Sequence, residues 1–94
     1  MQFPATDASL HTISNGLTVI MQVDQTAPVV SAQCWIATGS QHEEHFSGSG
    51  LSHLLEHMVF KGTDSFPGAE LATRVNSAGG QWNAYTSLDR TVYY

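Results

Sequence analysis

The sequence predicts an α+β fold in which helices pack on one face of a mostly antiparallel sheet. Apolar, β-branched runs of strand length stand near both ends of the chain, turn signals connect neighbouring runs, and two helix patterns lie between them. The predicted order is β-β-β-α-α-β-β, which forms a layer of helices on an antiparallel sheet. The 94 residues give room for one small domain, and a hydrophobic content of 41% is ordinary for a globular chain.

Charge and composition exclude several classes of partner. Eight acidic and three basic residues give a formal charge of -5 without a basic patch, so neither nucleic acid nor an anionic membrane is an expected partner. No apolar run approaches the length of a membrane span. Residues 1–4 lack the features of a signal peptide, which favours a cytoplasmic location. Cys34 is the single cysteine, and its apolar surroundings predict a buried thiol.

The N-terminal third is predicted to form strands. Residues 9–23 have the pattern of a hairpin in which Asn15 and Gly16 form a type I′ turn, because both residues tolerate positive φ. Residues 29–38 are a second apolar run, long enough for a central strand. Trp35 within this run is expected in the core.

An exposed loop is predicted at residues 39–50, which include three glycines and three serines. His42 and His45 lie in this loop without a fixed geometry, so they are expected to be solvated and not to form a second metal site. Gly50 is expected to let another backbone approach the start of the following helix.

Two helices are predicted next. The first covers residues 50–61, with Gly62 as its C′ residue. The second runs through residues 69–75; Pro67 is well placed as its first helical residue, and Gly79-Gly80 stops it. Residues 81–94 then form a second hairpin. Alternation assigns Gln81, Asn83 and Tyr85 to one face of its first strand and Trp82, Ala84 and Thr86 to the other.

The strongest chemical signal lies in the first predicted helix, which carries His53, Glu56 and His57. At about 100° per residue, His57 lies about 40° from His53 and Glu56 lies about 60° away on the other side. All three side chains therefore leave one side of a helix that is otherwise apolar. The helix is therefore expected to be buried. Buried polar groups without partners are costly, and a divalent metal bound by both histidines would satisfy them.

The order H-x-x-E-H is the inverzincin signature of zinc peptidases. His53 and His57 suit two of the three protein ligands of a catalytic Zn²⁺, and Glu56 suits the general base for the zinc-bound water. Glu70, in the second predicted helix, is an alternative third ligand. A solvated carboxylate that interacts with the helix dipole is the favoured interpretation of Glu70.

Several separated motifs, in the right order, resemble the N-terminal part of M16 metallopeptidases, the group of pitrilysin, insulin-degrading enzyme and the mitochondrial processing peptidase β subunit. The motifs are Asn15-Gly16-Leu17, Gly39-Ser40 with Glu43, residues 50–63, Asn83-Ala84-Tyr85-Thr86, and Asp89, Thr91 and Tyr93-Tyr94. The resemblance covers residues 10–94, and the HMVFKGT sequence is most similar to the bacterial, processing-peptidase-like branch.

This resemblance implies His53 and His57 as zinc ligands and Glu56 as the catalytic base. It also implies an edge strand at Asn83-Ala84-Tyr85, to which an extended peptide substrate adds. Taken alone, Asn83 is a strand-end residue that satisfies its own loop. A glutamate beyond residue 94 is implied as the third zinc ligand, and a homologous domain or subunit is implied as the partner in a homodimer or heterodimer.

Residues 1–94 are therefore expected to be the N-terminal portion of one catalytic domain, a fragment that is inactive by itself. The leading functional prediction is a zinc endopeptidase that acts on peptides or unfolded segments. The alternative is a non-catalytic M16-like subunit that binds peptides or a partner; such subunits are expected to lose the motif that is intact here. A third hypothesis, a structural metal site, needs a fourth protein ligand, for which no cysteine or histidine stands in an obvious position.

Overall fold

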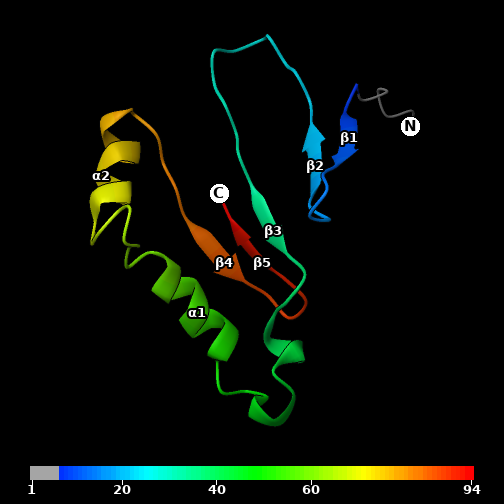
Figure 1. Ribbon diagram of the computed structural model, residues 1–94, viewed down its shortest axis with the longest axis vertical. Helices are drawn as coiled ribbons and strands as arrows, with labels where there is room; N and C mark the ends of the chain where they lie inside the picture. The colour runs from blue at the N-terminus through cyan, green and yellow to red at the C-terminus, as the bar shows by residue number, and fades with distance from the viewer. Residues whose placement is uncertain (1–6) are drawn as a thin grey trace. The chain divides into compact units, whose positions relative to one another are not determined.

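The structure is a computed structural model that describes residues 7–94, which divide into two compact units, one ending at Val30 and the other covering Ser31–Tyr94. The elements are β1 (Ser9–Thr12), β2 (Thr18–Met21), β3 (Cys34–Ile36), the 3₁₀ helices η1 (Ser40–His42) and η2 (Glu44–Phe46), α1 (Leu51–Val59), α2 (Glu70–Ser77), β4 (Ala84–Thr86) and β5 (Thr91–Tyr93) (Figure 1). The mixture of antiparallel strands and helices confirms the α+β class. No helix in the described part of the chain is long and apolar enough to cross a membrane. Residues 1–4, which suggested a cytoplasmic location, lie outside the described residues.

The first unit contains a two-stranded hairpin of β1 and β2. Its predicted type I′ turn is wrong, because Gly16 is the one position of the turn with a positive φ, 88°. The Ile13 amide donates to the Leu17 carbonyl and the Gly16 amide donates to the Ile13 carbonyl, at 3.0 and 2.9 Å. A three-residue loop with a left-handed glycine has this pattern. The backbone of Asn15 does not adopt the left-handed conformation, and the Asn15 side chain accepts the Leu17 amide at 3.0 Å.

The predicted single sheet is also wrong, because β3, β5 and β4 form a separate antiparallel sheet in that order. The strand expected over residues 29–38 is reduced to β3. Val29 and Val30 precede it without strand partners in the described structure and are 78% and 95% exposed. An apolar run indicates strand propensity, but a strand also needs a neighbour with free backbone groups.

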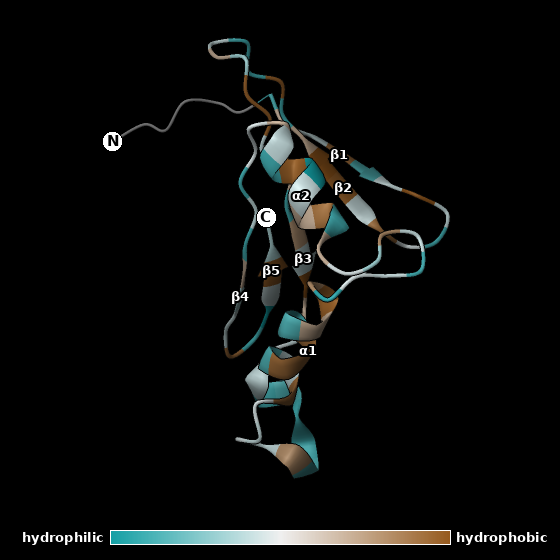
Figure 2. Cartoon of the chain, turned by 90° about the vertical axis from the view of Figure 1, so that its left-hand side faces the viewer, coloured by the Kyte–Doolittle hydropathy of each residue, from teal (hydrophilic) through white to brown (hydrophobic). Residues whose placement is uncertain are grey.

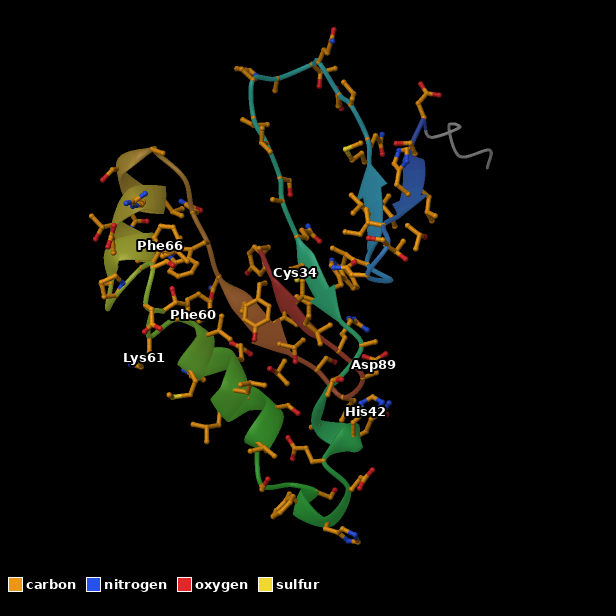
Figure 3. The ribbon with its side chains drawn as sticks, viewed as in Figure 1. Cys34, His42, Phe60, Lys61, Phe66 and Asp89 are labelled. Carbon is orange, nitrogen blue, oxygen red and sulfur yellow. The ribbon has the colours of Figure 1, made fainter. Side chains whose placement is uncertain are left out.

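β3 lies at an edge of this sheet, and two predictions of burial fail there. Cys34 and Trp35 are both exposed (Cys34 is labelled in Figure 3). The Trp35 indole donates to the Gln33 side chain at 2.8 Å, and the Arg90 guanidinium lies 5.6 Å from the centre of the Trp35 ring. Val92, in the central strand β5, is the buried hydrophobic residue of the described chain, with 1% exposure.

α1 packs beside β4, and the predicted alternation along β4 is correct. Trp82, Ala84 and Thr86 are partly buried, whereas Gln81, Asn83 and Tyr85 are exposed. Phe60, directly after α1 (labelled in Figure 3), packs against Trp82 with the ring centres 4.5 Å apart and the ring planes tilted by 53°. The partly buried face of β4 therefore belongs to the contact with α1.

The two ends of α1 lie close to the predicted positions, but its glycines have different roles from those expected. Gly50 has a φ of 75°, a backbone conformation that favours glycine. No other backbone approaches it closely, because a Cβ there would meet no atom within 4 Å. Gly62 is not the C′ residue, since the C-cap is Phe60. Its φ is 106°, and a Cβ would lie 2.6 Å from the Gly68 nitrogen. The close approach expected at Gly50 therefore occurs at Gly62, which forms a bridge with Pro67.

α2 begins at Glu70, so Pro67 is not its first helical residue as predicted. Its predicted stop at Gly79-Gly80 is confirmed. The Gly80 amide donates to the Val75 carbonyl at 3.0 Å, and Gly79 has a φ of 77°. This is the hydrogen-bond pattern of a Schellman motif, in which glycine takes the left-handed position without a steric cost.

The apolar side of α1 is exposed, contrary to the prediction of a buried helix. Glu56 is the one buried residue of α1. The exposed hydrophobic residues are Leu51, Leu54, Leu55, Met58 and Val59, at 48% to 63% exposure. Figure 2 views the chain from the side on which the helices lie in Figure 1, and the hydrophobic residues of α1 are brown. Within the described residues, α1 thus contacts the sheet through the side that carries its buried glutamate.

Candidate metal centre

α1 brings together His53, Glu56 and His57, which we call the α1 cluster. The two histidine Nε2 atoms are 2.9 Å apart. One possible ligand atom from each of the three residues lies within 4.8 Å of the others. Residues three and four apart lie on one side of a helix, which explains why a single short helix can assemble the group.

Glu56 is the buried member of the α1 cluster, and it is tied to the sheet. It is 7% exposed, whereas His53 and His57 are exposed. The Thr86 hydroxyl, at the end of β4, donates to Glu56 Oε2 at 2.6 Å. A buried carboxylate needs such a donor, because removal from water without a partner is costly. The carboxylate is therefore held in place while the imidazoles remain accessible.

Tyr93 contributes to the surroundings of Glu56 from the neighbouring strand β5. Burial, and then the negative charge of Glu56 and the Cys34 thiol, raise the pKa of the Tyr93 phenol. The direction of this pKa shift disfavours a phenolate, and so a second negative charge, beside Glu56.

Glu43 holds the start of α1, a role that the sequence did not reveal. The predicted loop contains η1 and η2, and Glu43 between them is 6% exposed. Its Oε1 accepts the Ser52 amide at 2.8 Å, and this hydrogen bond lowers the pKa of the Glu43 carboxyl against the opposing effect of burial. Two signals pointed to Glu43: its place in a motif of the family resemblance, and its position upstream of a helix whose own N-cap is glycine.

The other candidate ligands lie outside the α1 cluster. His42 Nδ1 accepts the Gly39 amide at 3.1 Å, and His42 and His45 are both exposed. Glu70 forms an exposed ion pair with Arg74 at 2.7 Å. These arrangements agree with the interpretation of all three as solvated side chains. Among residues 7–94, the α1 cluster is the one group of three acidic, histidine or cysteine side chains that satisfies the spacing for a metal.

The donor set of the α1 cluster fits a zinc ion in part. Imidazole nitrogens are preferred Zn²⁺ ligands, and the Nε2 atoms of His53 and His57 converge on one place. A catalytic zinc ion takes three protein ligands. If Glu56 is the general base, the described residues supply two of them.

β4 is an edge strand of the three-stranded sheet. Asn83 exchanges both backbone hydrogen bonds with Tyr94, at 2.6 and 2.8 Å, so alternation turns the backbone groups of Ala84 and Thr86 towards the free edge. The Asn83 side chain accepts the Ala84 amide at 2.9 Å, a purely local role. A cavity of about 550 Å³ is lined by Asn76, Gln81, Trp82, Asn83 and Tyr94. It lies at the start of β4, and the α1 cluster does not line it.

Comparison with known proteins gives consistent matches. The family model described as Insulinase (Peptidase family M16) matches residues 18–94. The chain is 42% identical over 84 residues to an uncharacterized zinc protease, YmxG, of Bacillus subtilis, which covers 89% of this chain and 20% of that protein. It is 38% identical over 90 residues to a probable mitochondrial-processing peptidase subunit beta of Arabidopsis thaliana, which covers 96% of this chain and 17% of that protein.

One further relative and one solved structure extend these matches. The chain is 38% identical over 95 residues to human cytochrome b-c1 complex subunit 1, covering 100% of this chain and 19% of that protein. The crystal structure of the first half of the periplasmic protease PqqL from Escherichia coli matches with a TM-score of 0.72 and 33% identity, covering 97% of this chain and 20% of that chain. The chain thus spans about a fifth of the length of these relatives.

Proposed function

Because this chain belongs to the insulinase family, peptidase family M16, we propose that the full-length protein containing it is a zinc endopeptidase that cleaves peptides or unfolded segments. The observation that carries the proposal is the α1 cluster, in which two converging imidazoles lie beside a buried, hydrogen-bonded carboxylate. The name of the Bacillus subtilis relative as a zinc protease supports the same chemistry.

In this proposal each member of the α1 cluster has a separate role. His53 and His57 would hold zinc through their Nε2 atoms. When bound, zinc would supply Lewis-acid chemistry, lowering the pKa of a water molecule and polarising the scissile carbonyl. Glu56 would take a proton from the attacking water and pass it to the leaving amine. Because the Thr86 hydroxyl donates to Oε2, we assign the transferred proton to Oε1.

The substrate would bind as an added strand on the free edge of β4. The Ala84 carbonyl and the backbone groups of Thr86 turn towards this edge, where the Asn83 side chain holds the Ala84 amide, and Asn83 borders the cavity at its start. Backbone hydrogen bonds would align the peptide, while the alternate side chains select the sequence. Thr86 also donates to Glu56, so a strand added here would run beside the general base.

A homologous domain or subunit is the proposed partner. Two relatives are, by their names, a processing-peptidase subunit beta and a subunit of the cytochrome b-c1 complex. The third zinc ligand is proposed to lie outside residues 1–94, so the isolated chain should bind zinc weakly and leave peptides uncleaved.

A chelation experiment tests the proposed activity. We expect the full-length protein to cleave an unstructured peptide, to lose this activity with a chelator and to regain it with added Zn²⁺, as followed by mass spectrometry of the products. Cleavage that persists at full rate without metal would contradict the proposal. The isolated 94-residue chain serves as the comparison, and chelator-sensitive cleavage by that chain would contradict the assignment of an external third ligand.

The hydrogen bond from Thr86 to Glu56 gives a second prediction. In the full-length protein, Thr86→Val should lower kcat by roughly 10- to 100-fold, because loss of a donor to a buried carboxylate costs about 1–3 kcal/mol. Zinc content should not change, since the hydroxyl bonds to Glu56 and not to either proposed zinc ligand. Thr86→Ser is the matched control, because it keeps the hydroxyl and should retain most of the activity. Equal losses in both variants would show that the hydroxyl is not the important group.

A non-catalytic, M16-like subunit is the second candidate function. The similarity to cytochrome b-c1 complex subunit 1 favours it, because that name denotes a complex subunit and not a protease. Such a protein would bind peptides or a partner chain through the edge of β4 and would leave the peptide intact. The presence of all three residues of the α1 cluster favours the enzyme. Peptide binding without cleavage, in the presence of Zn²⁺, would support the subunit.

A further inference from the structure

We propose that Glu43 is a positioning residue that holds the zinc-ligand helix α1 in its correct place on the sheet. This inference rests on the proposed function, since it concerns the placement of His53. It does not assign Glu43 a contact with metal or substrate. Two links support it: a hydrogen bond from α1 to Glu43, and hydrogen bonds from the loop of Glu43 to the β4–β5 turn.

The first link satisfies a helix end that has no cap of its own. The N-cap of α1 is Gly50, which has no side chain to accept a hydrogen bond. The first amides of a helix have no partner within the helix, and the second helical amide is one that an N-cap side chain normally satisfies. In α1 this amide belongs to Ser52, and Glu43 Oε1 accepts it at 2.8 Å from nine residues upstream. A negative charge is also favourable at this end of a helix.

The second link attaches the loop of Glu43 to the sheet. The Ser40 amide donates to the Ser87 carbonyl at 3.1 Å, and the Gln41 amide donates to the Leu88 carbonyl at 2.9 Å. A Cβ at Gly39 would overlap the Ser87 carbonyl, so glycine permits this close approach. Figure 3 shows η1, with His42, beside the β4–β5 turn that carries Asp89. Glu43 follows η1 directly and is therefore anchored to this turn.

α1 is consequently joined to one hairpin at two separate points. Glu43 holds the Ser52 amide, next to the ligand His53, and Thr86 holds Glu56 one turn later. With the Thr86–Glu56 hydrogen bond alone, α1 keeps the position of its base, but its first turn can fray. Metal ligands must keep their relative positions to within about 0.5 Å for a tight site. Loss of Glu43 should therefore weaken zinc binding through His53.

The test compares zinc affinities of full-length variants by competition with a chelator of known affinity. Glu43→Ala should weaken zinc binding by roughly 10- to 100-fold, the usual effect of losing a group that orients a ligand. Glu43→Gln keeps a carbonyl acceptor and should restore most of the affinity. Glu44→Ala is the matched control, since it removes the same charge from the exposed neighbouring residue. Zinc binding by Glu43→Ala that equals that of the wild type would overturn the inference.

Hydrogen exchange separates positioning from a general loss of stability. In the zinc-free protein, the backbone amides of Ser52 and His53 should exchange hydrogen faster in Glu43→Ala than in the wild type. The exchange rates of the β5 amides should not change. Uniformly faster exchange would overturn the inference, because the residue would then support the whole fold. If Glu43→Ala does not fold, Glu43→Asp, which is one methylene shorter, should bind zinc more weakly than the wild type, and equal binding would overturn the inference. Zinc affinity is measured without peptide, so a protein that binds zinc but does not cleave would refute the proposed function and leave this test intact.

Discussion

Glu56→Gln in the full-length protein is expected to lower kcat for peptide cleavage by about 10²- to 10⁴-fold, the contribution typical of a general base. Zinc content should remain at the level of the wild type. The amide has nearly the same shape as the carboxylate and can still accept the Thr86 hydroxyl, but it cannot take a proton at neutral pH. Steady-state kinetics and metal analysis of the same preparation measure both quantities.

The outcome distinguishes the two roles that the α1 cluster allows for Glu56. If Glu56→Gln lowers both zinc content and activity, Glu56 is a metal ligand and another group is the base. Unchanged turnover would refute the proposed role altogether. Glu44→Gln is a suitable control, because Glu44 is an exposed glutamate outside the cluster and its neutralisation should leave kcat unchanged.

The α1 cluster itself was predictable because its geometry is local. Helical periodicity alone places His53, Glu56 and His57 on one side of a helix, and the structure brings their ligand atoms within 4.8 Å. The ends of α1 were predicted to within two residues for the same reason. Strand alternation likewise placed Thr86 on the half-buried side of β4, although not its hydrogen bond to Glu56.

Contacts between distant segments were not predictable. Glu43 lies nine residues before its partner Ser52, and Thr86 lies 30 residues after Glu56. The glycines and serines around Glu43 correctly indicated irregular backbone, yet they carried no sign that its side chain would be buried. Such pairs depend on how the loop and the hairpin pack, and a local pattern contains no information about that packing.

Burial was overestimated for a different physical reason. Hydrophobic patterning indicates which side chains favour an apolar environment, but not which segment provides it. Leu54 and Leu55 on α1, and Trp35 on the edge strand β3, are 59%, 63% and 60% exposed in the described structure. The predicted single sheet failed in a related way, since strand propensity does not name the neighbour of a strand.

His57→Ala is expected to weaken zinc binding by more than about 100-fold. Removal of a metal ligand should have a larger effect than the roughly 10- to 100-fold loss that follows removal of a group that orients a ligand. Peptide cleavage should be lost at ordinary zinc concentrations. Since His53 Nε2 lies 2.9 Å from His57 Nε2, His53→Ala should have the same effect. Metal analysis after dialysis and a chelator competition measure the change in affinity.

His45→Ala provides the matched control, because His45 is an exposed histidine outside the α1 cluster. This substitution should leave zinc binding unchanged. His57 is also exposed, so its replacement should alter the unfolding free energy of the zinc-free protein by less than about 0.5 kcal/mol. Zinc binding that survives in both His53→Ala and His57→Ala would exclude the α1 cluster as the metal centre. Loss of zinc in His57→Ala combined with its retention in Glu56→Gln would assign ligand and base to different residues of one helix, which is the division of roles that the catalytic proposal requires.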